Sequence, residues 1–81
     1  MDNVLMVFSS LTTANRIKSE LEKRYAIKSK VIQTPKNIPV KSCSYCVKLA
    51  YKDLQKSWNM VKNLDVYTKG VYRESDYSKL I

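Results

Sequence analysis

Residues 4–8 are Val4-Leu5-Met6-Val7-Phe8, five apolar residues in succession. An apolar run of this length without a polar interruption is typical of a strand that is buried on both faces. We therefore expect residues 4–8 to form a central strand of a sheet, and the rest of the chain to supply its neighbours and its cover.

Two other segments have the spacing of amphipathic helices. In the first, the hydroxyl of Thr12 or Thr13 can cap the helix, and the apolar stripe consists of Ala14, Ile17 and Leu21. In the second, Asp53 takes the capping position, and the stripe consists of Leu54, Trp58, Val61 and Leu64. Each helix therefore has one apolar face that needs a sheet to cover.

Three further strands are predicted from β-branched and alternating residues. Residues 27–32 suit an edge strand, residues 45–51 a second central strand, and residues 65–72 a last strand that Lys69-Gly70 interrupts. The connection at 34–44 contains both prolines, which lack an amide hydrogen, so it cannot be a central strand.

The resulting order is βαββαβ, which predicts an α+β fold of the ferredoxin-like type. This fold is a four-stranded antiparallel sheet with two helices on one face, and its first and third strands are central. We expect residues 1–74 to form a single domain and residues 75–81 a flexible C-terminal tail.

Composition restricts the function. The 81 residues suffice for one core, and the sole glycine leaves no Gly-rich loop for a nucleotide, so we expect no cofactor and no elaborate enzyme. Histidine is absent, which excludes catalysis and metal binding by imidazole. The N-terminus lacks the pattern of a signal peptide and no apolar run could span a membrane, so a cytoplasmic location is predicted.

The formal charge is +8 and is concentrated in the middle of the chain. Between Lys23 and Lys62 there are ten basic residues and one acidic residue, Asp53. This excess predicts attraction to an acidic partner surface or to nucleic acid.

The two cysteines, Cys43 and Cys46, have a C-x-x-C spacing. A zinc site needs four ligands, so two thiolates and no histidine would require a dimer, and no metal site is predicted. A thioredoxin-like dithiol places its first cysteine at a helix N-terminus, whereas a strand follows here. A reversible disulfide remains open, as does the interpretation of both residues as ordinary buried apolar groups.

A third interpretation gives the two cysteines different roles. Cys43 lies in the loop beside Lys41, Ser42 and Lys48, and nearby cations favour the reactive thiolate. Cys43 is then the nucleophile or sulfur acceptor. Cys46 is either a resolving thiol or a small buried residue.

Several segments together resemble a small bacterial family of selenium/sulfur carrier protein-like domains: VLMVFSS at 4–10, ANRIKSEL at 14–21, KVIQTPK at 30–36, KSCSYCVKL at 41–49 and GVY at 70–72. The hallmark of that family is a Pro-Arg pair after the second strand, followed by Ser-Cys-Gly before an apolar strand with a basic residue. The corresponding residues here are Pro35-Lys36, Ser42-Cys43-Ser44 and Lys48.

The sequence departs from this pattern at four positions. Lysine replaces arginine at 36 and 48, which keeps the charge but loses the planar fork that grips an oxyanion in two places. Ser44 replaces the glycine, so a close backbone approach is less assured there. Cys46 stands where a small or apolar residue is usual.

The resemblance implies that Cys43 accepts a sulfane sulfur or selenium atom and passes it to a protein partner, with Lys36, Lys41, Ser42, Ser44 and Lys48 as binding residues. Two alternatives stay open. One is a nucleic-acid-binding module, favoured by six tyrosines and the charge, although the strands lack the usual aromatic signature. The other is a thiol–disulfide switch that uses Cys43 and Cys46. A homodimer through the uncovered sheet face or through the edge of the second strand also stays open.

Overall fold

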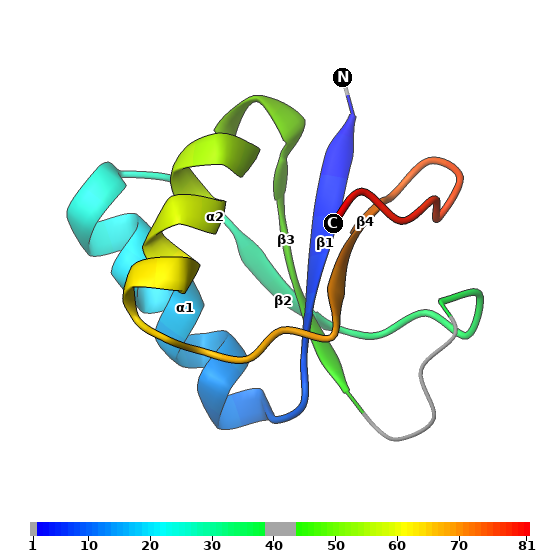
Figure 1. Ribbon diagram of the computed structural model, residues 1–81, viewed down its shortest axis with the longest axis horizontal. Coiled ribbons are helices and arrows are strands. Elements are labelled where there is room, and N and C mark those ends of the chain that lie inside the picture. Colours follow the sequence, from blue (N-terminus) through cyan, green and yellow to red (C-terminus); the bar gives the residue numbers. More distant parts are fainter. Residues whose placement is uncertain (1, 39–43) are drawn as a thin grey trace.

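The apolar run at 4–8 lies at the centre of the sheet (Figure 1). In the computed structural model, which describes residues 2–38 and 44–81, the run belongs to strand β1 (Asn3–Phe8). Strand β1 pairs antiparallel with β3 (Tyr45–Ala50) and β4 (Gly70–Arg73), and β2 (Lys30–Gln33) pairs with β3. The order β2-β3-β1-β4 confirms that the first and third strands are central.

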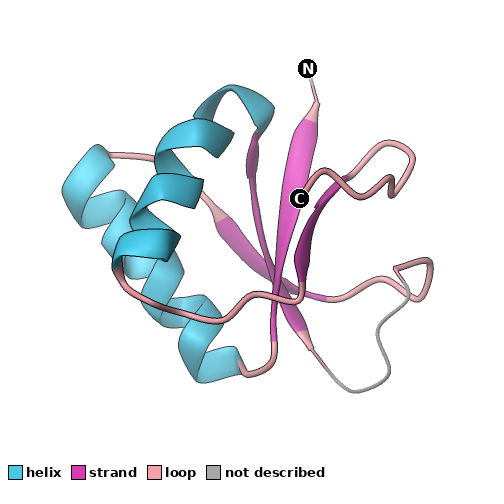
Figure 2. Ribbon diagram, in the orientation of Figure 1, coloured by secondary structure: helices cyan, strands magenta, loops and turns pink. Residues whose placement is uncertain are grey.

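Two helices cover one face of this sheet (Figure 2). They are α1 (Leu11–Tyr25) and α2 (Leu54–Asn63), and the short 3-10 helix η1 (Tyr51–Asp53) leads into α2. The ferredoxin-like α+β fold predicted from the sequence is confirmed. Within the described ranges no helix has the length and apolar character needed to cross a membrane.

The main core lies between the sheet and the helices. Alternate residues of β1 point toward the helices, because side chains along a strand alternate between its faces. The buried members of this core are Val4, Met6, Phe8, Ala14, Ile17, Leu21, Ile27, Val47, Leu49, Met60, Val61 and Val71. The predicted stripe of α1 is wholly buried. By contrast, Leu54 and Trp58 of α2 and the C-cap residue Leu64 are only partly buried at the margin of the core.

The start of α1 differs from the prediction, and the side chain predicted to cap α2 makes no capping bond. Ser10, rather than Thr12 or Thr13, caps α1, because its backbone is extended and its Oγ accepts from the Thr13 amide at 3.2 Å. Asp53 takes the N-cap position of α2, but its side chain makes no capping hydrogen bond there.

Two predicted strands begin later than expected. Ile27 lies just beyond the end of α1 and not in β2, because its amide donates to the Leu21 carbonyl at 3.2 Å and its side chain enters the core. Residues 65–69 are not strand, since the amides of Asp65 and Val66 donate back to the end of α2 and Asp65 has a φ of 55°.

The C-terminal residues return along β4. The Leu80 amide donates to the Val71 carbonyl at 2.7 Å, the Arg73 amide donates to the Ser78 carbonyl at 2.9 Å, and Leu80 packs against the main core. The flexibility expected of residues 75–81 stays a prediction. Hydrogen exchange of the Arg73 and Leu80 amides, which donate these bonds, would measure it.

Candidate functional site

Four of the predicted site residues lie in the described ranges, namely Lys36, Ser44, Cys46 and Lys48. The other three, Lys41, Ser42 and Cys43, lie outside the described residues. The geometry of the site is therefore built from the two ends of the 34–44 loop and from the sheet face beneath it.

The sheet face beneath the 34–44 loop is the one opposite the helices (Figure 1). It carries a small apolar cluster of its own. The strands contribute Leu5, Val7, Cys46 and Tyr72, and the 34–44 loop contributes Ile38, which is 2% exposed. Cys46 lies opposite Val7 on β1 and Ile32 on β2. Cys46 faces away from Val47 and Leu49, which belong to the main core on the other side of the sheet.

The same face bears on the nucleic-acid alternative. RNA-binding sheets stack bases on exposed aromatic side chains of their central strands. Here the central strands place Leu5, Val7, Cys46 and Lys48 on this face, and Tyr72 of β4 is only 5% exposed. The described part of the face offers no exposed aromatic ring from its strands, and nucleic-acid binding stays a prediction.

The 34–44 loop is held at its base by a cluster of three polar side chains. The Thr34 amide donates to the Ser44 carbonyl at 3.1 Å, which extends the pairing of β2 with β3 by one step. The Ser44 hydroxyl donates to Thr34 Oγ1 at 2.7 Å, and Thr34 Oγ1 lies 3.3 Å from Cys46 Sγ, within hydrogen-bonding distance. Ser44 is 2% exposed, so its hydroxyl is satisfied inside the protein.

Cys46 is a free thiol with no exposed surface. Burial raises the pKa of this thiol, and the hydrogen bond with Thr34 opposes that shift only in part. A buried thiol that stays protonated is a poor nucleophile. These properties favour the interpretation of Cys46 as a small buried residue, and its role as a resolving thiol stays a prediction.

Lys36 lies in a tight turn at the start of the loop. The Ile38 amide donates to the Pro35 carbonyl at 3.1 Å, and Ile38 inserts into the apolar cluster while Lys36 is exposed. The buried isoleucine thus anchors the turn that presents the lysine to solvent. Lys36 is therefore an exposed cation at the described start of the loop.

Lys48 forms an ion pair with Glu74. Its ammonium lies 2.8 Å from a carboxylate oxygen of Glu74, whose other oxygen accepts from the Asn3 side chain at 3.1 Å. The hydrogen bonds from Lys48 and from Asn3 lower the pKa of Glu74 below its usual range. Ser44, at the described end of the loop, and Lys48 are four residues apart along extended chain, about 13 Å. The role of Lys48 beside Cys43 stays a prediction.

Three residues with structural roles in this region were not identified from the sequence: Thr34, Ile38 and Glu74. The sequence could have pointed to Thr34, because a hydroxyl residue between a strand and a proline often hydrogen-bonds to nearby backbone or side-chain groups. Ile38 is the only bulky apolar residue between the two prolines, and this position could have indicated an anchor. Glu74 gave no signal, because its partners are distant in the sequence.

Among residues 2–38 and 44–81, no group of three or more His, Cys, Asp or Glu side chains is arranged to hold a metal ion. The described polar groups of the site are hydroxyls, one buried thiol, lysines and the Glu74 carboxylate that pairs with Lys48.

A family model described as "Putative Se/S carrier protein-like" matches residues 3–73. This range includes the 34–44 loop and all the strands and helices that the described residues form. No curated protein and no solved structure matches the chain.

Proposed function

Since the chain belongs to the Se/S carrier protein-like family, we propose that its Cys43 thiol accepts a sulfane sulfur or selenium atom and transfers it to a partner protein. The proposal assigns the chemistry to the 34–44 loop. The sheet and the helices serve as its support.

The burial of Cys46 is the observation that carries this assignment. The chain has two thiols, and a thiol that accepts sulfur from another molecule must reach solvent as a thiolate. Cys46 has no exposed surface and a raised pKa. Cys43, which directly precedes the anchored Ser44 in the sequence, is then the thiol assigned to exchange.

The transfer step is a thiol–disulfide type of exchange. The Cys43 thiolate attacks the outer sulfur of a donor persulfide, a new S–S bond forms at Cys43, the donor S–S bond breaks, and the donor leaves as a thiolate. The hydrogen of the donor's terminal S–H stays on the transferred sulfur. One S–S bond replaces another, so no external oxidant or reductant is needed, and selenium in place of the outer sulfur follows the same balance.

The remaining loop residues support this step in the proposal. Lys36 is exposed at the start of the loop, and Lys41 is two residues from Cys43, so both would favour the thiolate through their charge. Ser42 and Ser44 flank the thiol, and the bonds of Ser44 to Thr34 fix the end of the loop. Lys48 stays in the set of binding residues, and its ammonium is held by the pair with Glu74.

The test is mass spectrometry after incubation of the protein with a small-molecule persulfide. We expect a mass increase of one sulfur atom that is reversed by a reductant. The Cys46→Ala variant should load as the native protein does, and the Cys43→Ser variant should not load.

Loading of the Cys43→Ser variant at the native rate would contradict the assignment of the thiol. Loading of neither the native protein nor Cys46→Ala would contradict the carrier function itself. A matched labelling experiment with iodoacetamide should modify Cys46 in the Cys43→Ser variant only after the protein is unfolded.

A further inference from the structure

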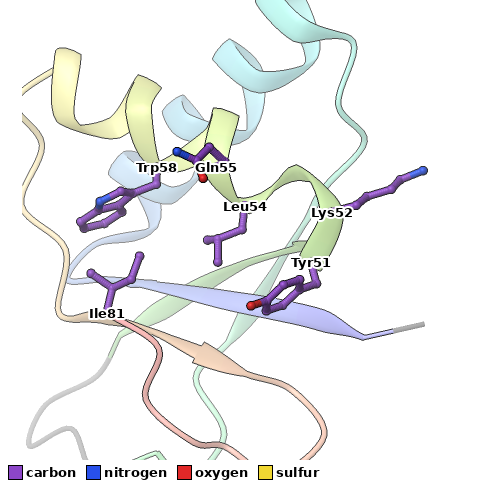
Figure 3. A pocket seen from close by; sticks show the side chains of 6 residues that line it. All are labelled: Tyr51, Lys52, Leu54, Gln55, Trp58 and Ile81. Carbon is purple, nitrogen blue, oxygen red and sulfur yellow. The ribbon is translucent and has the colours of Figure 1, made fainter.

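A hollow of about 360 Å³ lies between η1, α2 and the C-terminal residue (Figure 3). None of its described lining residues belongs to the 34–44 loop, so the proposed transfer chemistry does not account for it. The lining residues are Tyr51, Lys52, Leu54, Gln55, Trp58 and Ile81.

The walls of this hollow are mainly apolar and partly exposed. Tyr51 is 44% exposed and Ile81 is 42% exposed, which makes them two of the five large apolar residues that the described surface exposes. In Figure 3 the Trp58 ring lies beside Ile81, Leu54 lies between them and Tyr51, and Lys52 extends outward. Apolar side chains that gather around a hollow, rather than being scattered, are typical of an interaction site.

The aromatic walls are held in place. Leu54 and Trp58 pack against the main core, so their position does not depend on a ligand. The Arg73 guanidinium carbon lies 5.7 Å from the centre of the Tyr51 ring, a cation–π contact that orients the ring. Tryptophan, tyrosine and arginine are the residue types most enriched among the side chains that dominate binding energy in protein interfaces.

The charged residues near the hollow are mostly basic. Lys52 lines it, and residues 51–63 and 77–81, which include the lining, contain Lys52, Lys56, Lys62 and Lys79 against Asp53. Asp2 adds one carboxylate beside the Tyr51 wall, because it lies 4.0 Å from the Arg73 guanidinium that contacts the Tyr51 ring. A partner with carboxylates at the rim would complement this surface. A second copy of the chain would instead bring the same lysines and a further formal charge of +8.

We propose that this hollow is the docking site for the protein partner of the carrier, which inserts one apolar side chain between Tyr51, Trp58 and Ile81 and places carboxylates near Lys52. This inference rests on the proposed function, because a carrier must engage a donor or an acceptor. It assigns recognition to the α2 side of the molecule and transfer to the 34–44 loop.

Trp58 is the only tryptophan of the chain, so its fluorescence reports on the hollow directly. The experiment selects random short peptides displayed on phage against the Cys43→Ser variant, which cannot form a persulfide at that position. We expect the selected peptides to carry an aromatic or aliphatic residue flanked by Asp or Glu. Each should change the Trp58 fluorescence in a saturable way.

Two variants at exposed positions test where these peptides bind. Lys52→Glu should weaken binding about two- to fivefold, as expected for one exposed charge pair. Ile81→Ser should weaken it about five- to tenfold through the lost apolar contact. Two matched controls lie outside the hollow. Lys23→Glu makes the same charge change at the end of α1, and Tyr67→Ser removes a ring that is 75% exposed. Both control variants should bind the peptides as the parent does.

The proposal is overturned if no peptide is selected, if selected peptides are rich in Lys or Arg, or if Ile81→Ser binds as tightly as the parent. It is also overturned if sedimentation shows a dimer that Ile81→Ser dissociates, because a second copy would then fill the hollow. Failure of the carrier function is distinct, since it leaves Cys43 unloaded while peptide binding persists.

Discussion

The side chains of the face opposite the helices differ along the length of β3. Near the start of β3, Cys46 is enclosed by apolar groups and bonded to Thr34. Two residues farther along the same face, Lys48 is one-third exposed and forms its ion pair with Glu74. Burial raises the pKa of the Cys46 thiol, whereas the hydrogen bonds from Lys48 and Asn3 lower the pKa of the Glu74 carboxyl.

The Glu74 pair predicts a pH-dependent contribution to stability. Because the pKa of Glu74 is lower in the folded protein than its ordinary value of about 4.3, the contribution is fully present above that value and is lost as the pH falls through the folded pKa. At neutral pH we expect Glu74→Gln to lower the free energy of unfolding by about 0.5–1 kcal/mol.

Thermal unfolding of both proteins between neutral and strongly acidic pH checks this expectation. The difference between native and Glu74→Gln should shrink as the solution is acidified and vanish at the lowest pH. Glu22→Gln, at a 66% exposed position of α1, is the control and should change stability little. A difference that grows on acidification would refute the assignment.

The ends of the helices and strands are set by local backbone conformation together with one or two buried contacts. Helix α1 ends because Ala26 takes a left-handed conformation with a φ of 53°, and its amide donates to the Glu22 carbonyl at 3.2 Å. The next residue, Ile27, is then buried against the helix. Glycine adopts this conformation without the steric cost that alanine incurs.

The left-handed residue predicts a stabilising substitution. Ala26 is exposed, so Ala26→Gly removes no buried methyl group and relieves the strain at the end of α1. We expect an increase of about 0.5–1 kcal/mol in the free energy of unfolding, after part of the gain is offset by the greater freedom of glycine in the unfolded chain. Urea denaturation measures it.

The matched control is Arg16→Gly, at an exposed position inside α1. There the same glycine should lower the free energy of unfolding by about 1 kcal/mol. If Ala26→Gly destabilises the protein to the same extent, the left-handed conformation does not limit stability.

For the whole molecule, the two edges of the sheet differ. The outer side of β4 is paired with the C-terminal residues through the backbone bonds of Val71 and Arg73. Strand β2, at the other edge, is short and carries Lys30, and charged or short edge strands resist pairing with other chains. A homodimer through β2 stays a prediction.

Removal of residues 77–81 tests the role of the C-terminal segment. The truncated chain loses the backbone bonds to β4 and the packing of Leu80, so we expect a melting temperature lower by several degrees. The uncovered β4 edge should also cause concentration-dependent association, measured by sedimentation.

The Leu80→Ser variant is the control, because it keeps the backbone bonds while losing the side-chain packing. It should be destabilised without associating. An unchanged melting temperature in the truncated chain would instead agree with the flexible tail expected from the sequence.

The sequence by itself determined the order of the elements, the central position of the first and third strands and the ferredoxin-like fold, because periodic apolar patterns act locally and few arrangements bury them all. It also singled out the 34–44 loop and its thiol by residue type. It did not determine that Lys48 pairs with Glu74, that Thr34 joins Ser44 to Cys46, or that Tyr51, Trp58 and Ile81 form one hollow. Only the tertiary structure decided these contacts, because they depend on strand register and on the path of the C-terminal residues, which bring together side chains far apart along the chain.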